Sequence, residues 1–291
     1  MTKRLLFNIF APIFCAALTQ FLFEGIALAQ NIVAIAPTQY SPRTVALGLA
    51  DVADVRDEWA PNPAMPADTS ANIRAALWPL PLELASTYAA GFTADYPLSN
   101  SATAGASFTD YQSTNLFSWE SFGLQASKTF QVGSDSSNRK AVAGFRLRYA
   151  QETWNPQYVP AEDFTLDLGA EFDIASQLTL GAAVTHLFGT SDSVLIENRT
   201  AWLGLTYRPA AEAEANVAIE STAGSQAVIH AGVEYALDEY VFIRVGVETV
   251  NGDGIITGGI GVRADNLTID FAVSRHPVLG TSLSFGIGLA L

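Results

Sequence analysis

Residues 241–254, VFIRVGVETVNGDG, are compatible with two kinds of β-sheet protein. Aliphatic side chains occupy alternate positions, and Arg244 and Glu248 lie between them. This period of two predicts a strand with one apolar face, and the closing Asn-Gly-Asp-Gly predicts a turn. In a soluble sheet the apolar face packs on the core, whereas in a membrane barrel it contacts lipid and the charges point into the lumen. The rest of the chain has to distinguish the two.

The composition favours the barrel. Hydrophobic residues make up 49% of the 291 residues and charged residues only 15%, against about 25% charged residues in soluble domains. The mean hydropathy is +0.22. Beyond the N-terminal leader no run of about 20 apolar residues could form a membrane-spanning helix. An apolar chain of this kind suits a transmembrane barrel, in which only alternate residues need to be apolar.

The first 29 residues have the pattern of a secretory signal peptide. Lys3 and Arg4 precede an apolar run, and Ala27-Leu28-Ala29 is a small-x-small cleavage site before Gln30. An uncleaved anchor helix is the alternative. The only cysteine, Cys15, lies in this leader, so the mature chain has no disulfide and no thiol. Export without cysteine indicates the periplasm or outer membrane of a Gram-negative bacterium.

The acidic charge excludes one class of partner. The formal net charge is −14, and removal of the basic leader makes the chain slightly more negative. Nucleic acids bind proteins through cationic side chains that neutralise phosphates. We therefore expect no nucleic-acid partner.

From about residue 83 to residue 291 the chain consists of about a dozen alternating segments, each the length of a tilted strand that crosses a bilayer. A basic side chain that faced lipid at mid-depth would destabilise a barrel by about 2–4 kcal/mol, so the charged face is expected to point into the lumen. The pattern predicts an antiparallel up-and-down transmembrane β-barrel of 12–14 strands, with a soluble or periplasmic β-sandwich as the alternative. The charges that share the lumen side of the alternation are Arg146, Arg148, Asp167, Glu171, Glu234, Arg244, Glu248, Arg263 and Asp270.

The links between these segments alternate in length. Short turns such as 237–239 and 265–266 are separated by longer links such as 153–162 and 189–196. Outer-membrane barrels show this alternation because their periplasmic turns are short and their external loops are long. Residues 131–139 are an exception, since they form a long link where a short turn is expected.

Residues 30–82 do not alternate well and are rich in proline, which interrupts strands and helices. The segment is too apolar for a comfortable disordered tail. We therefore predict three parts: a signal peptide (1–29), an N-terminal hatch or plug inside the lumen (30–82), and an outer-membrane β-barrel (83–291).

The segment SPRTVALGLADVADVRDEWAPNPAM, residues 41–65, resembles the N-terminal hatch of the FadL-like outer-membrane proteins. These include long-chain fatty-acid transporters and PorV/PorQ-type proteins. The C-terminal strands, from HAGVEYALDEY to the final LSFGIGLAL, resemble those of the PorV-type branch. The chain departs from the family in having one glycine in the hatch turn and Leu291 as its last residue. The resemblance implies 14 strands and the hatch residues Arg43, Gly48, Asn62, Pro63 and Ala64.

The resemblance implies two functions. The first is passive uptake of a hydrophobic small molecule through an outer-membrane barrel surrounded by lipid. The second is that of a PorV-type accessory protein, which binds a protein partner of an outer-membrane secretion system. A structural or porin-like barrel with an open lumen is the third alternative. Lumen charges such as Arg244 and Glu248 are expected to anchor the hatch or to pair along the wall.

We find no pattern that predicts an enzyme. The three histidines lack metal-ligand spacing, and no nucleophile elbow, Walker A or dinucleotide fingerprint occurs. Ser274 and His276 share one face of a strand, but they are interpreted as a strand-end serine and a loop histidine. No catalytic residue, metal ion or cofactor is expected.

Overall fold

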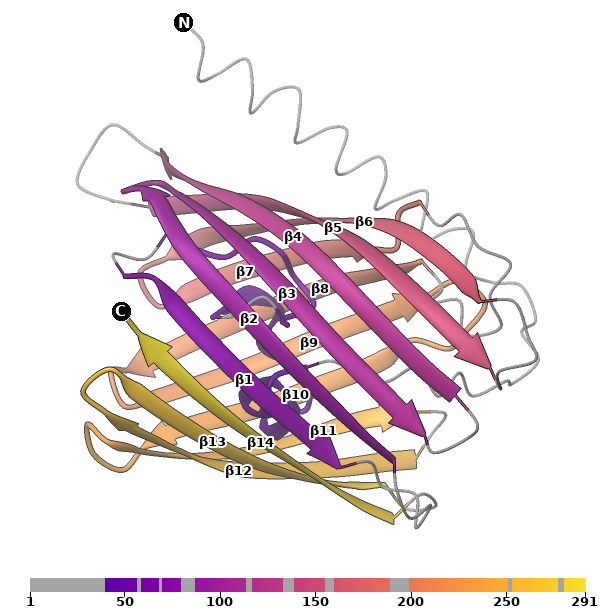
Figure 1. The fold of residues 1–291 in the computed structure, drawn as a ribbon. Coiled ribbons are helices and arrows are strands. Elements are labelled where there is room, and N and C mark those ends of the chain that lie inside the picture. Colours follow the sequence, from indigo (N-terminus) through magenta and orange to yellow (C-terminus); the bar gives the residue numbers. More distant parts are fainter. Residues whose placement is uncertain are drawn as a thin grey trace, which may run out of the picture.

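The computed structural model describes residues 40–56, 59–67, 70–79, 87–113, 117–132, 139–154, 160–188, 199–250, 253–276 and 280–291. The predicted signal peptide, residues 1–29, lies outside these ranges. The described chain forms one closed barrel with a short segment inside it (Figure 1).

Fourteen strands make up the wall, and each pairs antiparallel with its neighbours in sequence. β1 pairs with both β2 and β14, which closes the barrel. The predicted antiparallel up-and-down barrel is therefore confirmed, with 14 strands. The strands are β1 (Asn72–Pro79), β2 (Thr87–Ser99), β3 (Ala102–Ser113), β4 (Phe117–Val132), β5 (Arg139–Trp154), β6 (Ala161–Ala175), β7 (Leu178–Thr185), β8 (Thr200–Ala210), β9 (Ala213–Thr222), β10 (Val228–Ala236), β11 (Val241–Val250), β12 (Asp253–Ala264), β13 (Leu267–His276) and β14 (Gly280–Ala290).

The wall begins earlier than the sequence predicted. β1 lies inside the range 30–82 that was assigned to the hatch, so the predicted boundary at residue 83 is wrong. The strand was missed because Ala75 and Ala76 blur its alternation and Pro79 ends it. Pro79 is tolerated as the last residue of the strand, where the ladder ends.

The two faces of the wall answer the question that residues 241–254 raised. In β11 the side chain of Val245 is 62% exposed on the outside, whereas Arg244 is 5% exposed and points inward. Aromatic side chains also gather outside, where Phe92, Phe108 and Phe122 face one another across β2, β3 and β4. The charged face of the alternation is the lumen face.

The connections divide the barrel into two ends. Short turns join β6 to β7, β8 to β9 and β12 to β13, and β1 starts and β14 stops beside them. We call this the turn end and the opposite rim the link end. The exceptional link between β4 and β5 lies at the turn end, and its residues 133–138 are outside the described ranges. Among the described residues, no helix is long and apolar enough to cross a membrane.

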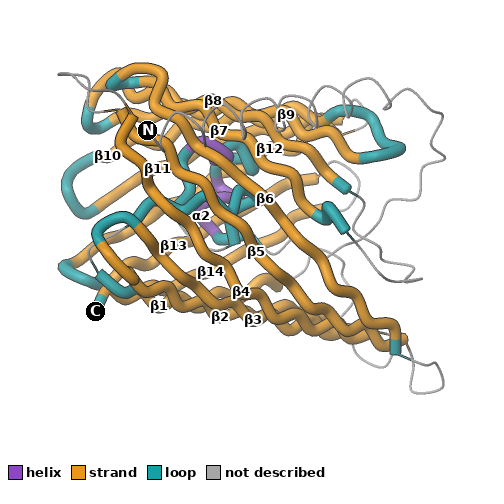
Figure 2. The backbone as a smooth tube through the Cα atoms, turned by 90° about the horizontal axis from the view of Figure 1, so that it is seen from above, coloured by secondary structure: helices purple, strands orange, loops and turns teal. Residues whose placement is uncertain are grey.

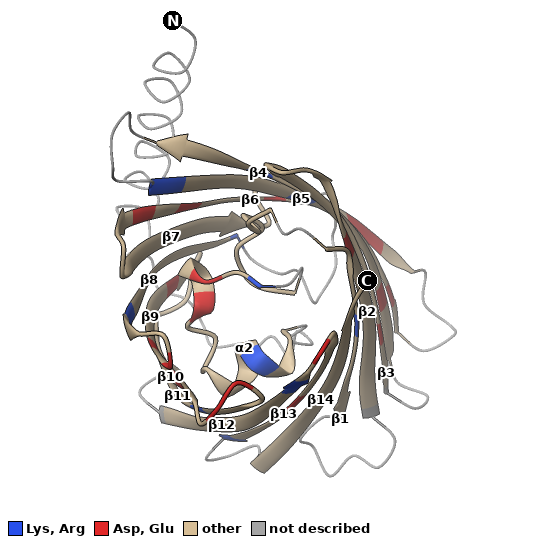
Figure 3. Cartoon of the chain, turned by 90° about the vertical axis from the view of Figure 1, so that its left-hand side faces the viewer, with Lys and Arg blue, Asp and Glu red and all other residues tan. Residues whose placement is uncertain are grey.

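Residues 40–56 and 59–67, which we call the plug, lie within the barrel (Figures 2 and 3). They include helix α2 (Pro42–Ala46) and a single 3₁₀ turn, η1 (Asp51–Ala53). Helix α2 contacts β11 to β14, and η1 contacts β7 to β9. The wall therefore encloses a folded segment in its lumen.

Candidate functional site

Local chemistry sets the bend of the plug. The Ser41 hydroxyl accepts a hydrogen bond from the Thr44 amide at 3.2 Å, and Pro42 occupies the first turn of α2. The helix ends because Gly48 and Leu49 take positive φ angles of 63° and 62°. A side chain at Gly48 would also meet the backbone of Val247 at 2.8 Å. The turn therefore requires glycine for both its conformation and its closeness to the wall.

The plug follows the inside of the wall in reverse strand order. Tyr40 accepts a hydrogen bond from the Trp78 indole of β1 at 2.7 Å. The segment then passes β14, β12, β11 and β10, continues along η1 past β8 and β7, and reaches β6, β5 and β4. Trp59 of the plug also reaches β2, where a Cβ atom at Gly91 would lie 3.0 Å from its ring, so the plug contacts the wall on all sides of the lumen.

Glycines on the lumen face make room for this segment. We call eight of them the glycine track. A Cβ atom at Gly204 would lie 2.8 Å from Val52 Cβ, and one at Gly259 would lie 2.6 Å from Ala46 Cβ. Such contacts are too close, so the wall at these positions fits the plug only without side chains. The glycine track consists of Gly144, Gly169, Gly181, Gly204, Gly232, Gly246, Gly259 and Gly286.

Asn62 joins the two halves of the plug to the wall. Its side-chain amide donates to the Val52 carbonyl at 2.7 Å and to the Ala170 carbonyl of β6 at 3.1 Å. Its Oδ1 accepts from the Ala64 amide at 3.0 Å. The residue is fully buried and all three contacts satisfy backbone groups, so an apolar replacement would leave them unpaired.

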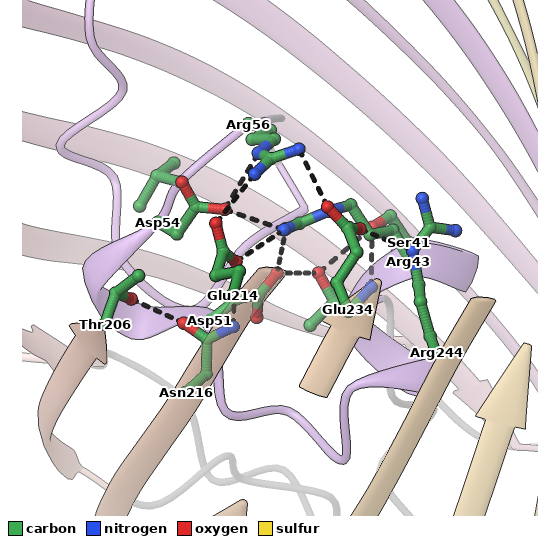
Figure 4. A network of polar contacts seen from close by, with 12 residues as sticks. Ser41, Arg43, Asp51, Asp54, Arg56, Thr206, Glu214, Asn216, Glu234 and Arg244 are labelled. Carbon is green, nitrogen blue, oxygen red and sulfur yellow. Dashed lines mark hydrogen bonds and ion pairs between the residues drawn. The ribbon is translucent and has the colours of Figure 1, made fainter. Parts of the chain in front are cut away.

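Arg43 is the centre of a buried ion network (Figure 4). Its guanidinium lies within 2.7–3.2 Å of four carboxylates, Asp51 and Asp54 of the plug and Glu214 and Glu234 of the wall. Buried charges are tolerated in proteins only when they are paired in this way. The network therefore links α2 and η1 to β9 and β10.

Three further arginines share these carboxylates. Arg56 of the plug contacts Asp54, Glu214 and Glu234. Arg208 of β8 contacts Asp54 and Glu214, and Arg244 of β11 contacts Glu234 at 2.6 Å. Each wall carboxylate is therefore held by arginines from both the plug and the wall.

The charges in the plug are fixed by this arrangement. Burial alone would raise the pKa of Asp54, but Arg56, Arg43 and Arg208 lower that pKa well below its ordinary value. Burial would lower the pKa of Arg43, but Glu234, Asp54, Glu214 and Asp51 raise it. Both groups therefore stay charged at any pH near neutrality.

The predicted lumen charges fall into two groups and some separate positions. Glu234, Arg244 and Asp270 form one chain of ion pairs that continues from Arg43. Arg146 and Arg148 form a second group with Asp167, and Arg146 also donates to the Ala60 carbonyl at 3.1 Å. The remaining three charges do not join either group: Glu171 accepts from the Val55 amide, Glu248 lies beside His230, and Arg263 stacks over Phe242.

The predicted hatch residues all contact the wall. Arg43 and Asn62 make the polar contacts described above, and Gly48 accepts a hydrogen bond from buried His230 at 2.8 Å. Pro63 and Ala64 pack on Gly144. Sequence reasoning missed Arg56, Arg208, Glu214 and most of the glycine track. The signal for the glycines was their repeated place on the lumen side of the alternation.

An aromatic cluster lies toward the link end of the lumen. Trp59 of the plug packs edge-to-face on Trp78 of β1 with ring centroids 5.4 Å apart. Tyr111 of β3 and Phe117 and Trp119 of β4 complete the buried cluster. This part of the lumen is lined mainly by aromatic rings, and the buried Glu152 of β5 lies opposite Trp119 at its edge.

Two cavities open toward the turn end. One, of about 430 Å³, is bounded by the plug, β1 and β12 to β14 and includes Arg74 and Asp95. The other, of about 480 Å³, is bounded by β8 to β10 and Arg56. Within the described chain, no three His, Cys, Asp or Glu side chains are grouped to hold a metal ion.

No family model matches the chain, and no curated protein sequence matches it. Solved structures with the same fold include two mutants of TodX, described as a monoaromatic hydrocarbon channel. The deltaS2 mutant is 11% identical with a TM-score of 0.57, and the alignment covers 88% of this chain and 99% of the mutant's chain. The deltaS2S3 mutant is 11% identical with a TM-score of 0.53, and covers 86% and 98%. At this identity the likeness establishes the fold alone.

Proposed function

We propose that the protein is a plugged outer-membrane channel for the passive uptake of small hydrophobic molecules. The proposal depends on the combination of an apolar outer face with a lumen that contains an aromatic cluster and a plug packed against glycines of the wall. An apolar solute could bind at the cluster formed with Trp59 and Trp78, where the lumen wall offers several aromatic rings.

The fold shared with TodX, which is described as a monoaromatic hydrocarbon channel, supports the proposal of a channel for hydrophobic molecules. The resemblance of residues 41–65 to FadL-like hatches points the same way. A simple porin-like pore would need an open lumen, whereas the plug contacts the wall from β14 round to β4. The PorV-type role depends on long external links, and residues 155–159 and 189–198 are outside the described ranges.

Planar-bilayer conductance tests the proposal. The full mature chain should conduct little, and a variant that lacks residues 40–67 should conduct steadily because the lumen loses its plug. Uptake of a hydrophobic probe, p-xylene, into cells that carry the full chain should exceed uptake into cells without it. Steady conductance by the full chain would instead indicate a simple pore, and no uptake would remove the transport proposal.

A further inference from the structure

His230 of β10 is a fully buried histidine that contacts the plug and the wall at the same time. Its Nδ1 lies 2.8 Å from the carbonyl oxygen of Gly48 in the plug, and its Nε2 lies 3.2 Å from Oε2 of Glu220 in β9. Its ring packs on Trp202 of β8, with ring centroids 5.3 Å apart. The imidazole is therefore held between an acceptor of the plug and an acceptor of the wall.

These two acceptors require two hydrogens. A carbonyl oxygen can only accept a hydrogen bond, so Nδ1 of His230 must carry a hydrogen to bind Gly48. An ionised carboxylate also only accepts, so the contact with Glu220 needs a second hydrogen on Nε2. A neutral imidazole carries one of these hydrogens and an imidazolium carries both. The count is the same if the second hydrogen lies on the carboxyl group, so the pair holds one proton more than a neutral histidine and an ionised glutamate supply.

The surroundings of His230 can balance the charge of an imidazolium. Glu248 of β11 lies directly opposite His230, with its carboxylate 3.7 Å from Nδ1. Glu220 is held in place by Thr222, whose hydroxyl donates to Oε1 at 2.9 Å and leaves Oε2 for the histidine. Among the described residues, the other groups next to the ring are uncharged: Trp202 of β8, Ala218 of β9, Gly232 of β10 and the plug backbone at Gly48.

The ion network is a separate group of charges. Its nearest member along β10 is Glu234, four residues from His230, and this carboxylate is held by Arg43, Arg56 and Arg244. The side chains of Glu220 and Glu248 are 22% and 15% exposed, whereas that of His230 is 0% exposed. The two glutamates therefore connect the buried ring to solvent, through which a proton can be exchanged.

A neutral His230 has to give up one of its two contacts. A hydrogen bond to an ionised acceptor is about twice as strong as one between neutral groups. The single hydrogen of the neutral ring is therefore expected on Nε2, against Glu220, which leaves the Nδ1 lone pair facing the Gly48 carbonyl. Two acceptors repel each other, and this buried carbonyl loses its partner. The contact that is lost is the one that joins the turn of the plug to the wall.

We propose that His230 and Glu220 form a proton-binding site that fastens the Gly48 turn of the plug to the wall. With the proton bound, the imidazole donates to both sides; without it, the turn loses its hydrogen bond to β10. Because the docked turn needs this proton and the released turn does not, thermodynamic linkage makes a lower pH favour docking. The coupling rests on the contacts of the plug, and its effect on uptake rests on the proposed channel function.

Two measurements on the full mature chain in lipid nanodiscs test the proposal between about pH 5 and about pH 9, the range in which histidine titrates. Nitrogen NMR of labelled histidine, assigned with His230→Gln, should show both ring nitrogens protonated at the acid end and one at the alkaline end. Hydrogen exchange is followed at the amides of Gly48 and Leu49, which bond within the plug. Their protection, relative to an unfolded chain at the same pH, should fall roughly tenfold toward the alkaline end.

Glu220→Gln separates the proton from the hydrogen bonds. Its side-chain oxygen can still accept from Thr222, and its amide can donate to Nε2 of a neutral His230 while Nδ1 donates to Gly48. No additional proton is needed, so protection should stay high across the whole pH range. Glu239→Gln is the matched control, because Glu239 is an exposed glutamate in the turn before β11, and it should keep the native pH dependence.

Three results would overturn the inference: a single protonated ring nitrogen in His230 at the acid end, equal protection of the native chain at both ends of the pH range, or a Glu220→Gln variant that keeps the native pH dependence. Conductance distinguishes this inference from the channel proposal. If protection changes with pH as expected but neither the full chain nor the variant without residues 40–67 conducts, the proton-binding site stands and the channel proposal fails.

Discussion

At the scale of single residues, Arg43 shows how a buried charge is stabilised. Four carboxylates surround it, and two of them belong to the wall. The sequence predicted Arg43 as a hatch residue and Glu234 as a lumen charge, but it could not predict that they meet. They are 191 residues apart, and only the closed barrel brings them together.

We expect Arg43→Ala to release the plug. Removing one member of a buried charge network costs about 3–5 kcal/mol, because the remaining carboxylates stay buried without a counter-charge. Channel openings of the variant in planar bilayers should be far more frequent than those of the native chain. Arg139→Ala, at an exposed end of β5, is the control and should behave as the native chain. Equal opening frequencies in both variants would show that the network does not hold the plug.

Adding a single Cβ atom at Gly232 tests how closely the plug packs against the wall. A Cβ atom there would overlap the backbone of Leu47, whereas nothing lies within 4 Å of one at Gly254. We expect Gly232→Ala to weaken docking by about 1–3 kcal/mol, as overpacking does. Hydrogen exchange of the plug amides should speed up in Gly232→Ala and stay unchanged in Gly254→Ala. Unchanged exchange in both would contradict the role of the glycine track.

At the scale of elements, the sequence predicted some strands and missed others for a physical reason. β11 has a wholly aliphatic outer face, so its alternation is clear. β1 and β3 carry many alanines and small polar residues, which contrast weakly between faces. Alternation also identified the lumen side of each charge but not the neighbour with which it pairs, because pairing depends on register. The contacts of the plug were unpredictable for the same reason.

The corrected start of the wall leads to a test with two deletions. A chain without residues 40–67 should still form a barrel, because β1 remains to pair with β2 and β14. A chain without residues 40–79 lacks β1, so β2 and β14 are left as open edges that cannot be satisfied in lipid. Heat-modifiable migration on gels should be seen in the first and absent in the second. A second variant that also migrates as a folded barrel would refute the role of β1 in closure.

At the scale of the whole molecule, the outer face determines which solvent surrounds the barrel. Val245 is 62% exposed at the middle of β11, whereas Leu237 is 59% exposed in the turn before it. In a bilayer, Val245→Arg should lower the free energy of unfolding by about 2–4 kcal/mol, and Leu237→Arg by about 0–1 kcal/mol. Denaturant titration from phospholipid vesicles measures both values. Equal costs would mean that lipid does not contact this face.

The contacts between the plug and the wall have a consequence for the order in which the chain folds. They extend round the wall from β1 to β14, so they also join the first described residues to strands that are synthesised last. Loop closure over such distances is slow, because the chain must be brought together before the contacts stabilise it. We therefore expect the plug to dock only when most of the wall has assembled. Assembly is then expected to pass through an unplugged barrel, with docking of the plug as a late step that seals it.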